Sequence, residues 1–371
     1  MRLTALLPPL LADPTIDDLV AAAGSRSRTD RTVVVAPGAR PAVLATMALG
    51  ASGIARATGA ADLAAPADAE EGTPLLVVTA TGRQAEETAA ALTCYLPSTD
   101  VAVFPAWETL PHERLSPRAD TVATRLSVLR RLAHPEDGRA GAPVSSGAPD
   151  PVSSGAPDPV SSGVPDPVSS GVPDPQRGPI RVLVVPVRAL LAPVVDGLGE
   201  LEPVHLAKGL EVGLEATAER LAAAAYTRVD MVENRGEFAV RGGILDVFPP
   251  TLARPVRVDF FGDEIESVST FAVADQRTIE EVDAVTATAC REIVLTDAVR
   301  ERARALTDVI PGAADMLGKI AEGINCEGME SLAPVLVERM VPLLDLVGDR
   351  LVVGLEPERL RKRAEDLVAT T

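Results

Sequence analysis

Residues 226–276 read YTRVDMVENRGEFAVRGGILDVFPPTLARPVRVDFFGDEIESVSTFAVADQ, and this stretch decides the fold of the domain around it. It holds Tyr226 and five of the six phenylalanines in the chain. Aromatic rings are the largest packing units in a protein, so a compact β-rich unit is expected where they gather.

Two hairpins are expected within this stretch. Gly242 and Gly243 separate the alternating run 238–241 from the run 244–248. Two glycines between β-rich runs favour a tight turn, because primed turns need positive φ angles. A second turn is expected at 262–263, between residues 256–261 and a strand that returns toward residue 271.

Alternation with a period of two predicts one packed face and one charged face for this sheet. The apolar residues at 256, 258 and 260 share one side, whereas Arg257 and Asp259 lie on the other. The same alternation turns Arg241 away from the apolar side, and Arg228 lies in a shorter alternating run, YTRVD. Taken alone, such a mixed-charge face of Arg228, Arg241, Arg257 and Asp259 is more often solvated than part of an interface.

These residues carry a resemblance to known proteins. The runs YTRVD from 226, GEFAVRGGILDVFP from 236 and RVDFFGDEI from 257 resemble a signature shared by two groups of bacterial excision-repair proteins. One group is UvrB, which verifies DNA damage. The other is the transcription-repair coupling factors, whose N-terminal part is a UvrB-homology module.

The segment 32–49 separates the two groups. TVVVA at 32–36 is expected to form a buried strand, followed by a turn at 37–41 and a helix over 42–49. Phosphate-binding loops occupy such a setting, but no GxxxxGK[ST] stands here, so the lysine and the Mg²⁺-binding hydroxyl are missing. UvrB carries an intact loop at this position and the coupling factors have lost it, so the chain is more similar to the coupling factors.

The region around the tryptophan supports the same choice. Three short segments look like the N-terminal region of the coupling factors: FPAWETLP from 104, SPRAD from 116 and RLSVLRRL from 125. UvrB has a tyrosine-rich hairpin there, and this chain has Trp107 without a tyrosine cluster. Stacking on bases contributes about 1–3 kcal/mol per base, so damage verification is not expected and Trp107 is predicted to be a packing residue.

The expected fold class is α/β. Residues 1–194 are predicted to form a helicase-like parallel α/β domain without the P-loop, and 195–275 an inserted small α+β domain that binds UvrA. Residues 276–371 are predicted to be mainly helical and to pack back on the first domain. Four octapeptides of the type PVSSGAPD fill 143–174. A disordered loop over about 137–178 is expected, because such a composition cannot offset its ordering entropy.

Composition limits the function classes. The formal net charge is −18, which disfavours autonomous DNA binding and favours protein partners. The three cysteines are far apart, lack ligand spacing and are expected to be buried reduced thiols. The histidines are isolated, and adjacent acidic residues do not share a helix face. We therefore expect no metal, no cofactor, no catalytic residues and no membrane span, in a cytoplasmic protein.

The resemblance implies the binding residues. In this family the small domain binds UvrA, the damage-sensing ATPase of nucleotide excision repair, through arginines of the YxR and VRG motifs and an acidic residue of RV[DE]FFGDE. At these positions the chain has Arg228, Arg241 and Asp259, with Arg257 and Phe248 as weaker candidates. Arginine suits the role because its planar fork of donors can pair bidentately across an interface.

The resemblance also implies the function. The chain is expected to be a non-catalytic N-terminal module that recruits UvrA in transcription-coupled repair. The parent of the family is an ATP-dependent DNA translocase that displaces stalled RNA polymerase, and contacts with polymerase and DNA would need further domains. We accordingly expect a fragment or a truncated gene product. A UvrB-like, ATP-binding verification protein and a generic α/β scaffold with a solvated face are the alternatives.

Overall fold

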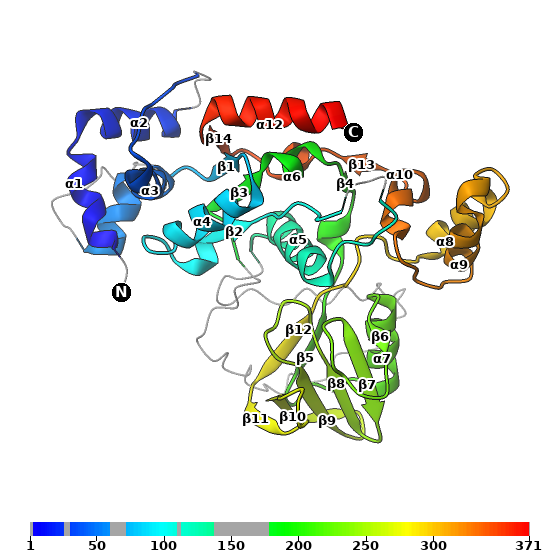
Figure 1. Ribbon diagram of the computed structural model, residues 1–371. Coiled ribbons are helices and arrows are strands. Elements are labelled where there is room, and N and C mark those ends of the chain that lie inside the picture. Colours follow the sequence, from blue (N-terminus) through cyan, green and yellow to red (C-terminus); the bar gives the residue numbers. More distant parts are fainter. Residues whose placement is uncertain (1–2, 26–29, 60–71, 110–112, 137–177, 371) are drawn as a thin grey trace, which may run out of the picture.

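The structure is a computed structural model that describes residues 3–25, 30–59, 72–109, 113–136 and 178–370. The octapeptide repeat at 143–174, predicted to be disordered, lies outside these residues. Figure 1 shows an α/β body with a β-rich small domain below it and a pair of helices, α8 and α9, at one side.

A four-stranded parallel sheet forms the centre of the α/β body. Its order is β14-β1-β3-β2, from β1 (Leu75–Thr79), β2 (Val101–Val103), β3 (Val182–Pro186) and β14 (Leu351–Gly354). Leu75 and Val77 pack into one hydrophobic core, and Leu76 and Val78 into another. Both faces of the sheet are therefore covered, as the nearly unbroken apolar strands predict.

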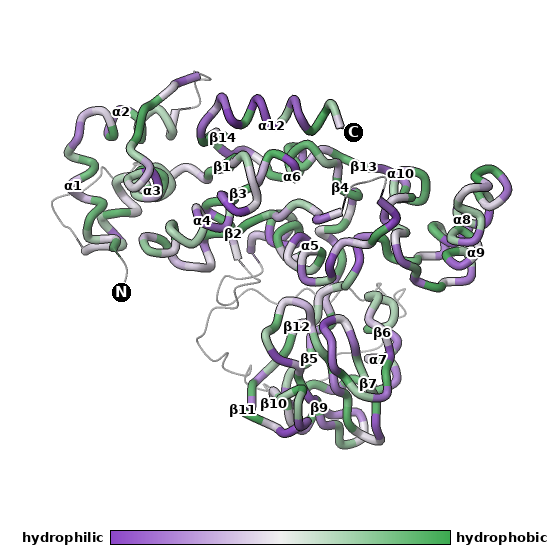
Figure 2. Tube along the Cα trace, viewed as in Figure 1, coloured by the Kyte–Doolittle hydropathy of each residue, from purple (hydrophilic) through white to green (hydrophobic). Residues whose placement is uncertain are grey.

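Helices surround this sheet (Figure 1). Residues of α1 (Leu7–Leu11), α2 (Pro14–Gly24), α3 (Arg40–Thr58) and α4 (Gly82–Leu92) build one core, and those of α5 (Ala119–Ala133) and α6 (Val187–Leu191) the other. The outermost helix, α12 (Pro357–Thr370), is mostly hydrophilic (Figure 2) and packs Leu360, Ala364 and Leu367 onto the second core. Short 3₁₀ helices occur at Thr4–Leu6, Pro37–Ala39, Ser98–Asp100, Leu198–Glu200, Pro311–Ala313 and Met329–Leu332.

The strand predicted at 32–36 is not formed. Residues 30–36 are described and adopt no regular structure, and Val34 is 98 % exposed. High β-propensity does not make a strand without a neighbour that satisfies its backbone groups. Both edges of β1 are already paired, one with β14 and the other with β3. The strand–turn–helix setting of a phosphate-binding loop is consequently incomplete here.

The small domain contains both predicted hairpins. Its six-stranded sheet has the order β11-β10-β9-β8-β7-β6. The turn glycines Gly242 and Gly262 adopt φ angles of +61° and +65°, as their sequence positions require. The strands are β6 (Thr227–Arg228), β7 (Glu237–Arg241), β8 (Ile244–Val247), β9 (Val256–Phe261), β10 (Glu264–Phe271) and β11 (Thr278–Glu281).

This domain extends past residue 275, where its end was predicted. The strand β11 continues the sheet beyond that point, and β12 (Ala284–Ala287) pairs with β5 (Val204–Ala207) ahead of helix α7 (Leu214–Ala223). All four residues of β11 are exposed. An edge strand of this kind has no apolar alternation from which it could have been recognised.

Between 293 and 350 the chain forms short helices and strands. Helices α8 (Asp297–Leu306) and α9 (Ala314–Ala321) agree with the helical character expected for this part of the chain. No continuous helix forms over 329–344, because Pro334 and Pro342 cannot donate the hydrogen bonds of a helix interior. The pieces are α10 (Ala333–Leu336), β13 (Met340–Val341), which pairs with β4 (Val194–Val195), and α11 (Leu343–Leu346).

A buried ion pair joins the α/β body to the segment that leaves the small domain. The side chains of Arg125 in α5 and Glu292 are 2 % and 1 % exposed, and Nε of Arg125 lies 2.5 Å from Oε1 of Glu292. The indole of Trp107 donates to the same oxygen at 2.9 Å, and the Arg125 guanidinium stacks 4.2 Å from the centre of the Phe104 ring. Trp107 is thus a packing residue at this joint, as predicted.

Glu292→Ala should destabilise the α/β body strongly, because it leaves the buried Arg125 without its counter-ion. Breaking a buried pair by removing one partner costs about 3–5 kcal/mol of unfolding free energy. The urea midpoint, followed by circular dichroism and by the fluorescence of Trp107, measures the loss. Arg83→Ala removes an exposed pair with Glu87 and should leave the midpoint unchanged; equal midpoints for both variants would contradict the importance of the joint.

Candidate protein-docking site

A buried carboxylate lies at the centre of the charged side of the small-domain sheet. Asp246 in β8 is 0 % exposed. Its Oδ1 accepts from Nε of Arg257 at 2.7 Å, and its Oδ2 accepts from Nη2 of Arg257 at 2.9 Å and from Nη2 of Arg241 at 2.5 Å. One aspartate therefore holds two arginines that come from the strands on either side of it.

Sequence reasoning missed Asp246 as a site residue. The run 244–248 reads as an apolar core strand, and the aspartate within it is one of the signature residues. Aspartate is almost never fully buried unless it is paired. An acidic residue between Leu245 and Val247, with arginines on the neighbouring strands, was the available signal.

Arg257 is the more buried of the two arginines, with 17 % of its side chain exposed. Its register partner in β8 is Asp246, its Nη1 donates to the carbonyl of Gln276 at 3.2 Å, and its guanidinium lies 4.8 Å from the centre of the Phe271 ring. The hydrogen bond with Asp246 raises the pKa of Arg257 above its usual value, against an opposing effect of burial. Arg257 therefore acts mainly as a fixed counter-ion inside the domain.

Arg241 reaches further toward solvent. It ends β7, its side chain is 47 % exposed, and a single hydrogen bond ties it to Asp246. A guanidinium carries five N–H groups, so most of its donors remain for solvent or a partner. The buried aspartate thus fixes the direction of a side chain whose outer part is accessible.

Arg228 lies at the edge of the sheet rather than on the same face as Arg241. The register pairs it with Phe238, whose ring packs in the main core, so alternation assigns the two arginines to opposite faces. They nevertheless line one hollow of about 750 Å³ together with Val229, Asp230 and Val240. The predicted charged face therefore excludes Arg228, which lies at the adjoining edge of the sheet. The face and this edge meet at the hollow.

Asp259 belongs to the same face as Arg241 and Arg257. It lies opposite Ile244 in β8, and its Oδ2 accepts a hydrogen bond of 2.7 Å from the hydroxyl of Ser267 in β10. The carboxylate is half-buried and is held by an uncharged donor. The face therefore presents charges of both signs, as predicted.

Phe248 lies under the surface instead of on it. It is 7 % exposed and packs with Val232 and Phe271 in a small second core, beneath the guanidinium of Arg235 at 5.5 Å from the ring centre. Its contribution to any docking surface would come through the residues that it supports.

The loop that follows Arg228 is fixed by Glu237. The carboxylate of Glu237 accepts from the backbone N–H groups of Glu233 at 2.9 Å and Asn234 at 2.8 Å, and from the side-chain amide of Asn234 at 3.0 Å. Partial burial raises the pKa of Glu237, but the hydrogen bonds from Glu233 and Asn234 outweigh it, so that the pKa is lowered. The loop also buries Val232 completely.

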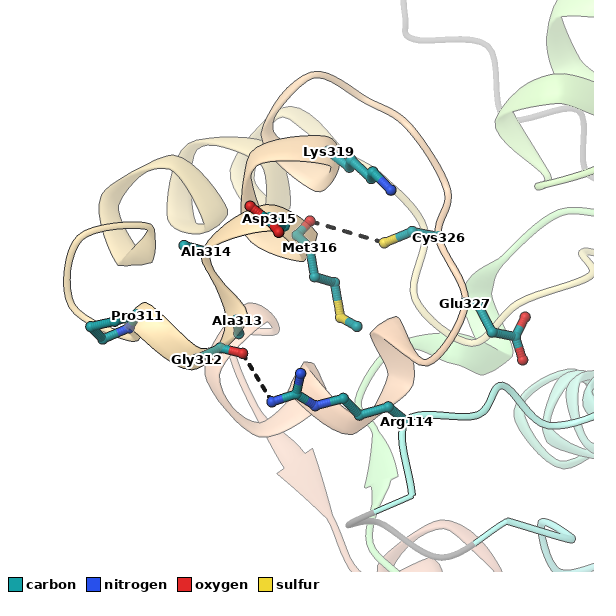
Figure 3. A pocket seen from close by; sticks show the side chains of 10 residues that line it. All are labelled: Arg114, Pro311, Gly312, Ala313, Ala314, Asp315, Met316, Lys319, Cys326 and Glu327. Atoms are coloured by element: carbon teal, nitrogen blue, oxygen red, sulfur yellow. Dashed lines mark hydrogen bonds between the residues drawn. The ribbon is translucent and has the colours of Figure 1, made fainter.

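A second hollow, of about 350 Å³, lies at the start of α9 (Figure 3). Arg114 donates to the carbonyl of Gly312 at 2.9 Å there, and the thiol of Cys326 approaches the carbonyl of Met316 at 3.9 Å. Burial raises the pKa of Cys326, so its thiol is not an activated nucleophile. The side chains around it include Lys319 and Asp315 in addition to Arg114, and this mixture of charges defines no ligand chemistry.

Cysteines and possible metal ligands are the other candidate groups. All three cysteines are unpaired: Cys290 is buried, which raises the pKa of its thiol to about 12, whereas Cys94 is exposed, contrary to the expectation of buried thiols. Within the described ranges, no group of histidine, cysteine, aspartate and glutamate side chains could hold a metal ion. In the same ranges, no helix has the length and apolar character needed to cross a membrane.

Comparison with known proteins gives matches to the small domain alone and to nearly the whole chain. The family described as the UvrB interaction domain matches residues 204–292. A transcription-repair-coupling factor from Mycobacterium bovis is 42 % identical over 99 % of this chain and 26 % of its own length. Those of Bacillus subtilis and Escherichia coli are 26 % and 29 % identical over 86 % and 64 % of the chain. The chain spans 17–26 % of the length of these three relatives.

Asp246→Ala should unfold or loosen the small domain, because Arg257 would stay buried without a counter-ion. The expected loss of unfolding free energy is about 3–5 kcal/mol. Thermal denaturation followed by circular dichroism measures it. Glu266→Ala, which removes an exposed carboxylate from the bulge in β10, is the control and should leave the transition unchanged. A wild-type transition for Asp246→Ala would show that the buried pairing is dispensable.

Glu237→Gln should make the stability of the protein less dependent on pH in the acid range. The lowered pKa of Glu237 in the folded state means that its carboxylate contributes stability above its unfolded pKa of about 4.3, and that this contribution is lost as pH falls through the folded value. Wild-type melting temperature should therefore fall more steeply than that of the variant between about pH 5 and pH 3. Parallel curves would contradict the role assigned to this carboxylate.

Proposed function

We propose that this chain is the N-terminal module of a transcription-repair-coupling factor and recruits UvrA in transcription-coupled nucleotide excision repair, since a coupling factor from Mycobacterium bovis is 42 % identical over 99 % of the chain. In this proposal the chain acts as a docking module and carries out no catalysis of its own. The observation that carries the proposal is the pair Arg241 and Asp246, in which a buried carboxylate holds a solvent-exposed arginine at the position of the family's VRG motif.

The proposed binding site combines the charged face with the adjoining edge. Arg241, Asp259 and the edge residue Arg228 would make the polar contacts with UvrA, and the shared hollow of about 750 Å³ would receive a group from UvrA that carries an acceptor. Arg257 and Phe248 would support this surface from below. Arginine pairs well with a carboxylate in such a place, because two parallel N–H donors fit its two oxygens.

The α/β body would be the scaffold of this module. We assign it to a helicase-like half that has lost its phosphate-binding loop, on the strength of the parallel sheet with helices on both faces. The C-terminal strand β14 and helix α12 would complete that half, since β14 pairs with β1. The missing lysine of the GxxxxGK[ST] motif and the absence of a strand within the described segment 30–36 support a non-catalytic role.

The translocase activity and the contacts with RNA polymerase and DNA would then belong to the other three quarters of a coupling factor. Net charge supports this division, because a chain with a formal charge of −18 repels the phosphate backbone.

The double variant Arg228→Ala, Arg241→Ala should abolish a micromolar complex with UvrA. Truncation of an interfacial hydrogen-bonded charge typically costs about 2–5 kcal/mol. Isothermal titration calorimetry of the purified chain with UvrA measures the affinity. Arg277→Ala removes an exposed arginine of the same domain and should bind like the wild type. Unchanged binding by the double variant would instead favour a scaffold with a solvated face.

Equilibrium dialysis with ATP tests the enzymatic alternative. The docking proposal predicts no ATP binding by this chain up to millimolar nucleotide, because the groups that grip the phosphates and Mg²⁺ are missing from the sequence. Saturable ATP binding would favour a UvrB-like, damage-verifying function.

A further inference from the structure

One phenylalanine of the small domain is left in solvent. Phe261, the last residue of β9, is 79 % exposed, whereas the other five phenylalanines, all of them described, are buried or half-buried. The ring lies next to the turn at Gly262 and opposite Glu264 in β10. It therefore offers an apolar surface beside the exposed polar residues Asp263 and Glu264.

The register places this ring on the proposed binding face. Phe261 follows Asp259 by two residues along β9, so the two side chains share a side of the sheet. Asp259 lies opposite Ile244, and Ile244 lies opposite Arg241, in one row across three strands. Neighbouring strands are about 4.8 Å apart and a strand rises about 3.3 Å per residue, so Phe261 and Arg241 are separated by roughly 12 Å.

The two hairpin turns bring these residues to the same end of the sheet. The N–H of Phe260 donates to the carbonyl of Gly243 at 2.8 Å, so the end of β9 lies beside the first turn. A side chain on Gly243 would approach the carbonyl oxygen of Phe260 to 3.0 Å, so glycine there permits the strands to close together. At this end of the sheet, the charged Arg241 is therefore followed by the half-buried Ile244 and then by the exposed ring of Phe261.

We propose that Phe261 is the apolar anchor of the UvrA-binding surface, a role that rests on the proposed function above. The ring would enter an apolar pocket on UvrA, next to a carboxylate that pairs with Arg241 and a donor that reaches Asp259. Binding energy in interfaces concentrates in a few large side chains, often aromatic rings or arginines, that are fully desolvated in the complex and surrounded by a polar rim. One partner contributes about 800 Å² to a standard interface, which corresponds to a patch roughly 30 Å across. Two side chains separated by roughly 12 Å therefore fit within one such interface.

The test compares Phe261→Ala with Arg241→Ala in titrations of the full chain with UvrA at low and high salt. Phe261→Ala should weaken binding at least tenfold and leave its salt dependence unchanged, because an apolar contact is not screened. Arg241→Ala should weaken binding and reduce the salt dependence. Val309→Ala, which trims an exposed apolar residue outside the small domain, is the control and should bind like the wild type.

Each outcome decides one of the two proposals. Wild-type affinity for Phe261→Ala, together with weakened binding for Arg241→Ala, overturns the anchor and leaves the docking function in place. Failure of the wild-type chain to bind UvrA overturns the docking function and the anchor with it. Phe261→Leu keeps a large apolar side chain without the aromatic ring. If the pocket on UvrA is apolar, this variant should bind more tightly than Phe261→Ala. Circular dichroism confirms that each variant is folded.

Discussion

The pairing of one buried carboxylate with two arginines links the interior of the small domain to its surface. A fully buried charge is costly to desolvate, and only close hydrogen-bonded partners offset that cost. Asp246 obtains them from Arg257, which stays inside, and from Arg241, which reaches out. Because the same oxygen atom serves both arginines, the core cannot rearrange without moving the exposed one. An exposed side chain held in this way would lose little conformational freedom on binding a partner, as the proposed docking requires.

A second buried charge pair fixes the small domain in the molecule. Arg125 and Glu292 meet where the chain leaves the small domain and returns to the α/β body, and Trp107 completes their hydrogen bonding. The pairing of Asp246 with its arginines orients a side chain within the small domain. The pair Arg125–Glu292 anchors the last segment of that domain to helix α5. The proposed docking surface is therefore held in a defined position by a contact with the body, which contributes none of the proposed binding residues.

The sequence was most informative where alternation, glycine turns and aromatic content agreed, as they do over 226–276. Both hairpins and the common face of Arg241, Arg257 and Asp259 could be predicted there. Prediction failed where a neighbour decided the outcome. The stretch 32–36 has high β-propensity but pairs with no strand of the sheet, whereas the exposed strand β11 pairs with the edge of β10. Asp246 and the edge position of Arg228 depend on register, which a single sequence does not fix.

Hydrogen–deuterium exchange of the full chain, with and without saturating UvrA, tests most directly whether this domain docks through the surface that Asp246 organises. Docking through this surface should slow exchange in 226–231, 240–246 and 257–264, and leave exchange unchanged in 36–49 and 351–354 of the α/β body. Slowed exchange confined to the α/β body or to α8 and α9, with the three segments of the small domain unaffected, would contradict it.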